Sequence, residues 1–429
     1  MSAVKKFHTV FAAAALAITL AACSAQQSGT GPLATASPTA TNASAQSATQ
    51  ETATPAALSE ARQFSATIAL LVPLTATGQT AEIAKRLKQA GELALFEYRN
   101  PSLQLVVKDT QGTPDGARAA TQAAIQQGAE IIIGPLFAKS VTAAAEIARP
   151  AGIPVVGFSN NPAVAGNGVY LLSFLADQEI ERVVSHATAS GVQRFAGLIP
   201  AGTYGDTLQA AFRGALTRNG GLLVDLQRYP PGATGMLARI DDLIEAIKGP
   251  AEAPIVPPRA DAIFVPGDQG MLPTIGAALE NGKLNTKAVR LLGNGGWGYP
   301  GIGRTRATHG GWYAAPDPAG FEAFAGKFSQ TFGSQPPRIA SFAYDGVAIA
   351  AALAKAYPKG QRYQPAQMTN ASGFTGVDGA VRFSSSGLSE RALAVIEVTA
   401  NGPQIVSPAP ASFSRPQAAV AGTANTFAQ

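Results

Sequence analysis

Seven polar residues each follow a short β-type run of the sequence, close to the point where a strand is expected to end. In open α/β sheets, ligands bind beyond the carboxyl ends of the strands, so side chains placed there face a cleft. Hydroxyl, amide and carboxylate groups at these positions can hydrogen-bond a small polar molecule. The sequence therefore nominates a ligand-binding cleft formed by Thr75, Ser140, Ser159, Asn160, Tyr204, Asp268 and Asn294.

Several of these residues also have a structural interpretation. Ser140 stands at the start of an expected helix, where it could receive a ligand carboxylate or simply cap the helix. Tyr204 could stack on a ligand or fill the side of the cleft. An amino-acid ligand would need a carboxylate for its ammonium group, and Asp268 or Asp177 would have to supply it. Either aspartate could instead be a solvated or capping residue, so residue type alone leaves these alternatives open.

Catalytic chemistry has little support in the residue inventory. The chain has three histidines and one cysteine, and no Gly-x-Ser-x-Gly sequence occurs, which argues against a serine hydrolase and a histidine-rich metal site. The stretch from Gly293 to Gly298 fits the GxGxxG dinucleotide pattern, but Pro300 and further glycines follow where that pattern requires a helix. We expect a non-enzymatic protein without cofactor or metal, in which this glycine-rich segment is a structural loop.

The elements that must position these residues alternate between short apolar runs and helical patterns. The runs are short, β-branched and mostly free of charge, as expected of strands buried on both faces of a parallel sheet. Helical spacing is clear after the first run, where Ile83, Leu87 and Ala90 recur on one face. This rhythm predicts an α/β fold with right-handed crossovers and two sheets. The expected strands are 66–72, 103–108, 130–133, 154–158, 194–199, 222–227, 261–265 and 289–292; the helices include 114–127, 141–149, 178–189, 207–218, 236–248, 321–332 and 339–356.

A series of short motifs in this region resembles the type I periplasmic binding proteins, the family that includes the branched-chain amino-acid receptors. The motifs, in chain order, are the first strand Ala66 to Leu74, Lys108-Asp-Thr110, Ile133-Gly-Pro-Leu136, Ala151-Gly-Ile-Pro-Val-Val156, Thr203-Tyr-Gly205 and Phe342-Ala-Tyr-Asp-Gly346. The resemblance implies a two-lobed fold, each lobe a doubly wound, mostly parallel sheet with helices on both faces, joined by three crossovers. It places residues 66–172 and 312–357 in the first lobe and residues 178–310 and 374–400 in the second.

The N-terminus has the features of an exported leader. Lys5 and Lys6 precede an apolar run that is too short to span a bilayer. Leu20-Ala-Ala-Cys23 is similar to the lipobox of bacterial lipoproteins, which implies cleavage after residue 22 and acylation of Cys23. The residue after the cysteine is Ser24 rather than a retention aspartate, which by the same resemblance favours the periplasmic face of the outer membrane.

Residues 23–65 and 406–429 are rich in small residues and proline, a composition that cannot repay the entropy of folding. We interpret the first as a tether, whose 40 or so residues would reach about 130 Å when stretched, and the second as a disordered tail. The folded domain is then expected over residues 66–405. The chain carries a formal charge of +5, but its basic residues are scattered. A nucleic-acid partner is therefore not expected.

Two functions agree with these features. The chain resembles lipoproteins that activate class A penicillin-binding proteins during peptidoglycan synthesis. The features that it shares with them are the lipobox, the tether and the turns at Gly134 to Phe137 and Phe158 to Asn160. At Phe158 to Asn161 the sequence departs from the Ser-Ala-Thr type of turn in the amino-acid receptors. The alternative is the solute-binding subunit of an ABC importer for branched-chain amino acids or similar solutes. The expected partners are thus the membrane, a class A penicillin-binding protein, and a small amino-acid-like or peptide ligand.

Lipidation of Cys23 can be tested directly. We expect labelled palmitate to be incorporated into the wild-type protein in cells and not into Cys23→Ser, because the thiol is the only one in the chain. Incorporation that survives this substitution would contradict the assignment.

Overall fold

The computed structural model describes residues 65–100, 102–230, 233–249 and 257–413. The leader, Cys23, the expected tether and residues 414–429 lie outside the described residues. All described residues belong to one compact unit of the chain. None of the helices in the described part combines the length and the apolar character needed to cross a bilayer.

The first sheet has five parallel strands in the order β2-β1-β3-β4-β5. Their bounds are Ala66–Val72 (β1), Leu103–Asp109 (β2), Ala129–Ile133 (β3), Val155–Gly157 (β4) and Val169–Leu171 (β5). Leu70 stands opposite Val107 of β2 and Ile133 of β3. Every residue of the interior strand β1 except Thr67 is buried, as expected of a largely apolar run in a parallel sheet that is covered on both faces.

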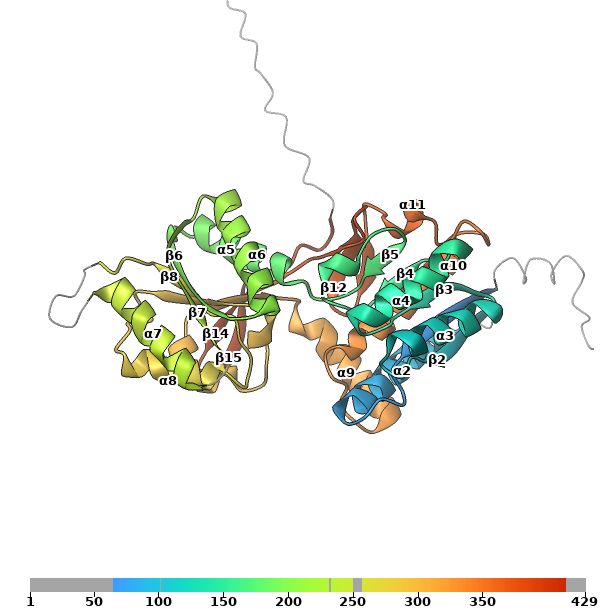
Figure 1. The fold of residues 1–429 in the computed structure, drawn as a ribbon, viewed down its shortest axis with the longest axis horizontal. Coiled ribbons are helices and arrows are strands. Elements are labelled where there is room, and N and C mark those ends of the chain that lie inside the picture. The colour runs from blue at the N-terminus through green and yellow to red at the C-terminus, as the bar shows by residue number, and fades with distance from the viewer. Residues whose placement is uncertain (1–64, 101, 231–232, 250–256, 414–429) are drawn as a thin grey trace, which may run out of the picture. The chain divides into compact units, whose positions relative to one another are not determined.

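Helices cover both faces of this sheet (Figure 1). They are α2 (Gln79–Tyr98), α3 (Pro114–Gln126), α4 (Ala138–Ala148), α9 (Pro318–Phe332) and α10 (Ala340–Ala356). Ile68 and Leu70 of β1 pack in the core cluster that contains α2 and α10. Ala69 and Leu71 point to the opposite face and pack with α3 and α4. The two-residue period of the strand therefore divides its side chains between two cores.

The second sheet has seven strands in the order β15-β14-β10-β9-β8-β6-β7. The five strands from β10 to β7 are parallel, whereas β14 is antiparallel to both β10 and β15. The strands are Arg194–Pro200 (β6), Leu222–Tyr229 (β7), Ala262–Phe264 (β8), Arg290–Gly293 (β9), Trp312–Ala315 (β10), Ala394–Thr399 (β14) and Gly402–Ser407 (β15).

Two pairs of helices enclose this second sheet. Helices α5 (Ala176–Ala189) and α6 (Thr203–Asn219) pack on the face that carries Phe195 and Phe264. On the other face, α7 (Ala233–Lys248) and α8 (Leu272–Asn281) pack against Leu198 and Ile263. Each lobe is thus a three-layer unit with its own apolar cores, and the expected two-lobed α/β fold class is confirmed.

A small antiparallel sheet, in the order β11-β12-β13, follows α10 and the short helix α11 (Pro365–Met368). Its strands are Phe374–Gly376 (β11), Gly379–Phe383 (β12) and Ser389–Arg391 (β13). Val381 and Phe383 of β12 are buried in the core cluster of the first lobe. In the described part of the chain, 3-10 helices occupy Arg149–Ala151, Pro162–Val164, Gly295–Trp297, Ile302–Arg304 and Arg306–Thr308.

Three expected boundaries differ from the structure. Residues 312–315, expected in the first lobe, form β10 of the second sheet because they pair with β9 and β14. Residues 374–391, expected in the second lobe, form the small sheet on the first lobe, and the chain returns to the second sheet only at β14. The disordered tail is expected to begin at residue 406, but strand β15 continues to Ser407, which still pairs with Val395 of β14.

The glycine-rich segment is built around a buried tryptophan. Gly295–Trp297 is a 3-10 helix, not the start of an α-helix, and Trp297 is fully buried with its indole N–H donating to the carbonyl of Val265 at 2.9 Å. A Cβ atom added at Gly293 would lie 2.2 Å from this indole ring. Close packing against Trp297 therefore requires a glycine at position 293. This first glycine of the GxGxxG pattern has a structural role that does not depend on a bound dinucleotide.

This packing predicts opposite effects for two glycine substitutions. Gly293→Ala should lower the free energy of unfolding by about 1–3 kcal/mol, since the new methyl group overpacks the core. Gly326→Ala is the matched control, because it lies exposed in α9 with nothing within 4 Å of its added Cβ; it should raise the free energy by about 0.5–1 kcal/mol. Urea unfolding of the two variants measures both changes, and equal stabilities would contradict the packing argument.

Candidate functional site

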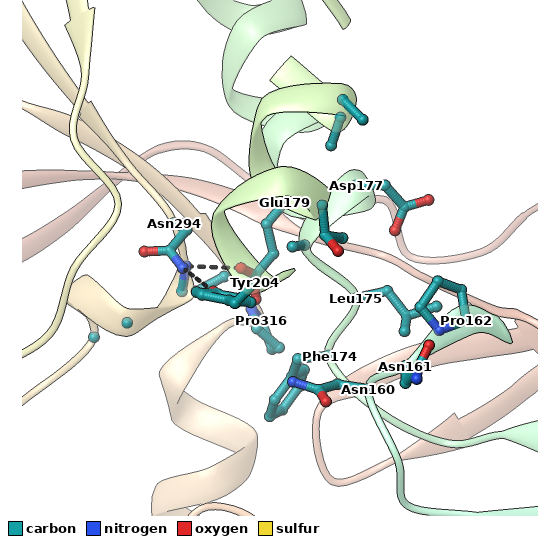
Figure 2. A pocket seen from close by; sticks show the side chains of 18 of the residues that line it. Asn160, Asn161, Pro162, Phe174, Leu175, Asp177, Glu179, Tyr204, Asn294 and Pro316 are labelled. Atoms are coloured by element: carbon teal, nitrogen blue, oxygen red, sulfur yellow. Dashed lines mark hydrogen bonds between the residues drawn. The ribbon is translucent and has the colours of Figure 1, made fainter. Parts of the chain in front are cut away.

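A cavity of about 960 Å³ lies at the carboxyl ends of strands from both lobes. Asn160, Asn161 and Pro162 follow β4 in the first lobe, whereas Tyr204 and Asn294 follow β6 and β9 in the second. In Figure 2 these two groups lie on opposite sides of the pocket. The remaining lining residues come from the segments near the crossovers and the adjacent helices: Phe174, Leu175, Ala176, Asp177, Glu179, Thr203, Thr207, Ala210, Ala211, Gly295, Gly296, Gly298, Ala315, Pro316 and Arg338.

Tyr204 and Asn294 form a polar pair on the wall from the second lobe. The side-chain amide of Asn294 donates to the Tyr204 hydroxyl at 3.3 Å, and its carbonyl oxygen accepts from the backbone N–H of Gly267 at 3.3 Å. Asn294 is buried, whereas Tyr204 is half-exposed and lines the cavity with its ring. The pair therefore offers an aromatic surface that is held in place by a hydrogen bond.

Glu179, in the first two turns of α5, is the buried carboxyl group of the pocket. Its Oε2 accepts from the backbone N–H of Gly295 at 3.0 Å. The pKa of Glu179 is raised to about 7, mainly by burial and to a smaller extent by the charge of Asp177, whereas the Gly295 N–H and Arg338 act to lower it. A Cβ atom at Gly295 would lie 2.5 Å from Glu179 Oε1, so this glycine allows the close approach. Glu179 can therefore gain or lose a proton near neutral pH.

Arg338 supplies a cation to the same pocket. Its Nη2 donates to Asp378 Oδ1 at 2.5 Å, and its guanidinium lies 4.6 Å from the ring centroid of Phe321. Asp378 is buried and also accepts from the Ser341 hydroxyl at 2.6 Å. The arginine side chain remains about 36% exposed, so the guanidinium is oriented by Asp378 while it still faces the cavity.

Of the seven cleft residues nominated from the sequence, the structure brings Asn160, Tyr204 and Asn294 together in the cavity. Thr75, Ser159 and Asp268 lie outside its lining. Thr75 donates through its hydroxyl to Asp109 Oδ2 at 2.6 Å. Ser159 is buried and accepts from the N–H of Asn161, and Asp268 accepts from the N–H of Gly270 at 2.9 Å. Ser159 and Asp268 therefore stabilise local turns, whereas Thr75 joins the loop after β1 to the end of β2.

Ser140 also lies outside the lining of the cavity, and it is not the N-cap of the helix, which was the alternative interpretation. Helix α4 begins two residues earlier, with Phe137 at its N-cap position. Ser140 is buried inside the first turn, and its hydroxyl has no hydrogen-bond partner among the described residues.

Sequence reasoning missed the two charged groups that dominate the pocket, Glu179 and Arg338. Glu179 lies within an expected helix, where a carboxylate is normally a solvated residue, and Arg338 directly precedes another helix. Asp177, which was weighed as the carboxylate for a ligand ammonium, does line the cavity. No sequence signal marked Glu179, because residues two apart on a helix do not share a face and burial is not visible in the sequence.

Comparisons with known proteins agree with this architecture. A curated relative, the uncharacterized protein RP748 of Rickettsia prowazekii, is 22% identical over 231 residues, which are 53% of this chain and 59% of the relative. The chain thus spans about three fifths of the length of this relative.

Many solved structures share the fold, and two of them serve as examples. One, from Rhodospirillum rubrum and assigned to branched-chain amino acid ABC transport, matches with a TM-score of 0.68 and 18% identity over 80% of this chain and 100% of that chain. The other, a branched-chain amino acid ABC transporter periplasmic ligand-binding protein from Burkholderia xenovorans, has a TM-score of 0.63 and 17% identity over 82% of this chain and 97% of that chain. The periplasmic binding protein family model matches residues 65–403. Together with its two-lobed type I fold, this match places the chain in the periplasmic binding protein family.

Proposed function

We propose that this protein captures a small polar solute in the described cavity and serves as the solute-binding subunit of an ABC importer. The observation that carries the proposal is the lining of the cavity by both lobes, with Asn160 on one side and Tyr204, Asn294 and Glu179 on the other. A cavity of this size is typical of sites for small organic ligands. The match to the binding-protein family supports the same function.

The charged residues of the lining favour a ligand that carries both a carboxylate and a protonated amine. Arg338 would bind a carboxylate, and Asp177 or Glu179 would bind a protonated amine. Phe174 and Tyr204 offer apolar surface between such groups. An amino acid or a short peptide has this combination, and the two solved structures with the same fold are described in terms of branched-chain amino acid transport.

The first expectation, an activator of class A penicillin-binding proteins, rested mainly on Cys23 and the tether, which lie outside the described residues. The relatives with a described function are ABC-transport proteins instead. We therefore place the importer function first. Acylation of Cys23 and attachment to the cell envelope, at the outer membrane by the sorting resemblance, remain proposals. A permanent anchor at the outer membrane would favour the activator function, because a receptor for an importer normally diffuses to its transporter.

Calorimetry of residues 24–429 with the twenty amino acids and a set of dipeptides tests the ligand class. We expect at least one to bind, and we expect Tyr204→Ala to weaken that binding about tenfold because the stacking surface is lost. Phe96→Ala is the control, because Phe96 is an aromatic residue that is 74% exposed and does not line the cavity. No binding to any of these ligands, combined with retention of a class A penicillin-binding protein in a pull-down, would replace the importer proposal by the activator function.

The pKa of Glu179 predicts opposite effects of pH on stability and on ligand binding. Because the folded pKa of about 7 lies above the usual value of 4.5, folding is less favourable when this group must ionise, so the free energy of unfolding should fall as pH rises from 4.5 to 7. Affinity for a ligand with a protonated amine should rise over pH 6 to 8, as Glu179 becomes negative.

Glu179→Gln should reduce the pH dependence of stability and the pH dependence of ligand affinity. Denaturant unfolding measures the first between about pH 4.5 and 7, and calorimetry measures the second between about pH 6 and 8. Asp345 is a second buried carboxyl whose pKa is raised to about 7 by burial, so Asp345→Asn is a matched control. It should reduce the pH dependence of stability but leave that of binding. A binding profile that is unchanged in Glu179→Gln would contradict the role of this carboxylate.

A further inference from the structure

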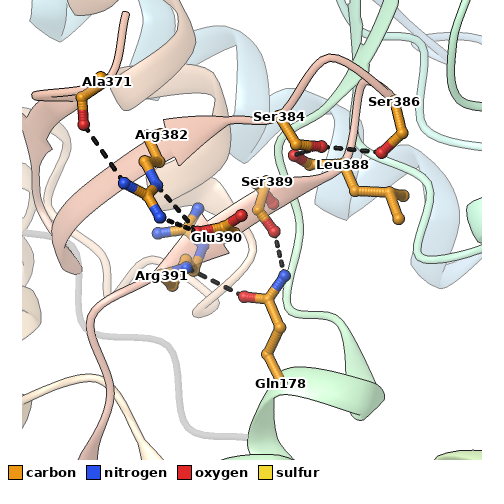
Figure 3. A network of polar contacts seen from close by, with 9 residues as sticks. All are labelled: Gln178, Ala371, Arg382, Ser384, Ser386, Leu388, Ser389, Glu390 and Arg391. Carbon is orange, nitrogen blue, oxygen red and sulfur yellow. Dashed lines mark hydrogen bonds and ion pairs between the residues drawn. The ribbon is translucent and has the colours of Figure 1, made fainter. Parts of the chain in front are cut away.

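Gln178 connects the pocket helix α5 to the small sheet of the first lobe. Its side-chain amide donates to the backbone carbonyl of Ser389, and its side-chain carbonyl accepts from the backbone N–H of Arg391 at 2.9 Å. Figure 3 shows both bonds between Gln178 and strand β13. The partners are more than two hundred residues apart in the sequence, so these bonds join two distant segments of the chain.

The two backbone groups that Gln178 contacts are those that a further strand would use. Strand β13 is at the edge of the small sheet and pairs with β12 on its other side. Along a strand, the backbone groups of alternate residues point in the same direction. A carboxamide carries one donor and one acceptor, so it can satisfy the C=O of Ser389 and the N–H of Arg391 together. Gln178 thereby takes the place of one residue of a neighbouring strand.

Besides Gln178, the first turn of α5 has a hydrogen bond to another segment through Glu179, which accepts from the backbone N–H of Gly295. The N-cap residue Leu175 is buried but makes no side-chain capping hydrogen bond. The residues on each side of Gln178 in the sequence, Asp177 and Glu179, both line the cavity. Successive side chains on a helix point about 100° apart, so Gln178 can bond to β13 while its two neighbours line the pocket.

Arg391 gives β13 a second connection to the pocket wall. Its side chain is buried, and its Nε donates to the carbonyl of Ser173 at 3.1 Å. The guanidinium also lies 4.9 Å from the ring centroid of Phe174, which lines the cavity. The end of β13 therefore contacts the pocket wall through Gln178 on α5 and through Ser173 and Phe174 in the segment between β5 and α5.

We propose that Gln178 is a positioning residue of the pocket, which fastens the first turn of α5 to β13 and so holds Asp177 and Glu179 at the cavity wall. This inference rests on the proposed binding function and names a residue that determines how that site is arranged. Gln178 does not line the cavity itself, so its effect on a ligand acts through its two neighbours.

Two variants separate positioning from a merely structural role. Gln178→Met keeps the length of the side chain but removes both hydrogen bonds, and Gln178→Glu keeps an acceptor but loses the donor to Ser389. Glu390→Gln is the control: it breaks an ion pair of 2.6 Å with Arg382 on the same small sheet, and Glu390 does not line the cavity.

The first measurement is the titration of the Glu179 carboxyl carbon by NMR, assigned with Glu179→Gln. In the two Gln178 variants we expect its midpoint to fall from about 7 by at least about one pH unit, because a loosened α5 admits water to the carboxyl group. The control should leave the midpoint unchanged. A lower melting temperature with an unchanged midpoint in both variants would overturn the proposal and leave Gln178 a structural residue.

The second measurement is calorimetry of the same proteins with L-leucine. If the wild type binds leucine, the dissociation constant should rise about tenfold in the Gln178 variants, equivalent to the loss of about 1.4 kcal/mol, and stay constant in Glu390→Gln. Equal affinities in all variants would count against positioning. If the wild type does not bind leucine, that result bears on the proposed ligand class alone, and the Glu179 titration still decides the role of Gln178.

Discussion

Parallel strand pairing is the constraint on which the rest of this structure depends. A connection between two parallel strands must return the chain to the end of the sheet where the first strand began. In this chain most of these connections contain helices, and the helices bury both faces of each sheet. In each sheet, the segments that leave the parallel strands gather at the carboxyl ends of those strands. The loop after β4 of the first sheet and the loops after β6 and β9 of the second sheet line the cavity. The pocket is thus a consequence of the topology, and its chemistry depends on the residues placed there.

The chemistry of the pocket depends on charges that are partly withdrawn from water. Glu179 is buried against the N–H of Gly295, and burial raises its pKa to about 7. Arg338 is held by Asp378, which is itself buried. A carboxylate or guanidinium without such partners would be costly to bury. The same close contacts explain the glycines of the loop after β9, since side chains at Gly293 and Gly295 would collide with Trp297 and Glu179.

The small sheet β11-β12-β13 links the first lobe to the start of the second. It packs through Val381 and Phe383 on the core of the first lobe, and Gln178 of α5 bonds to its edge strand. Arg391, on the same strand, contacts the crossover at Ser173 and Phe174. The pocket wall on α5 therefore depends on a strand that lies more than two hundred residues later in the chain, and the arrangement of the site depends on how the C-terminal part of the domain folds.

The sequence by itself determined the α/β class, the first strand over residues 66–72 and most of the helices, because strand and helix periodicity are local properties of the chain. It also predicted three residues that line the cavity, Asn160, Tyr204 and Asn294, since the rule that ligands bind beyond strand ends needs only the order of elements. Only the tertiary structure decided that Trp312–Ala315 belongs to the second sheet and that residues 374–391 belong to the first lobe, because strand pairing is a long-range choice. The same holds for Glu179, Arg338 and Gln178. Their residue types are ordinary on a helix or in a loop, and they became site residues through burial and contacts with segments far away in the sequence.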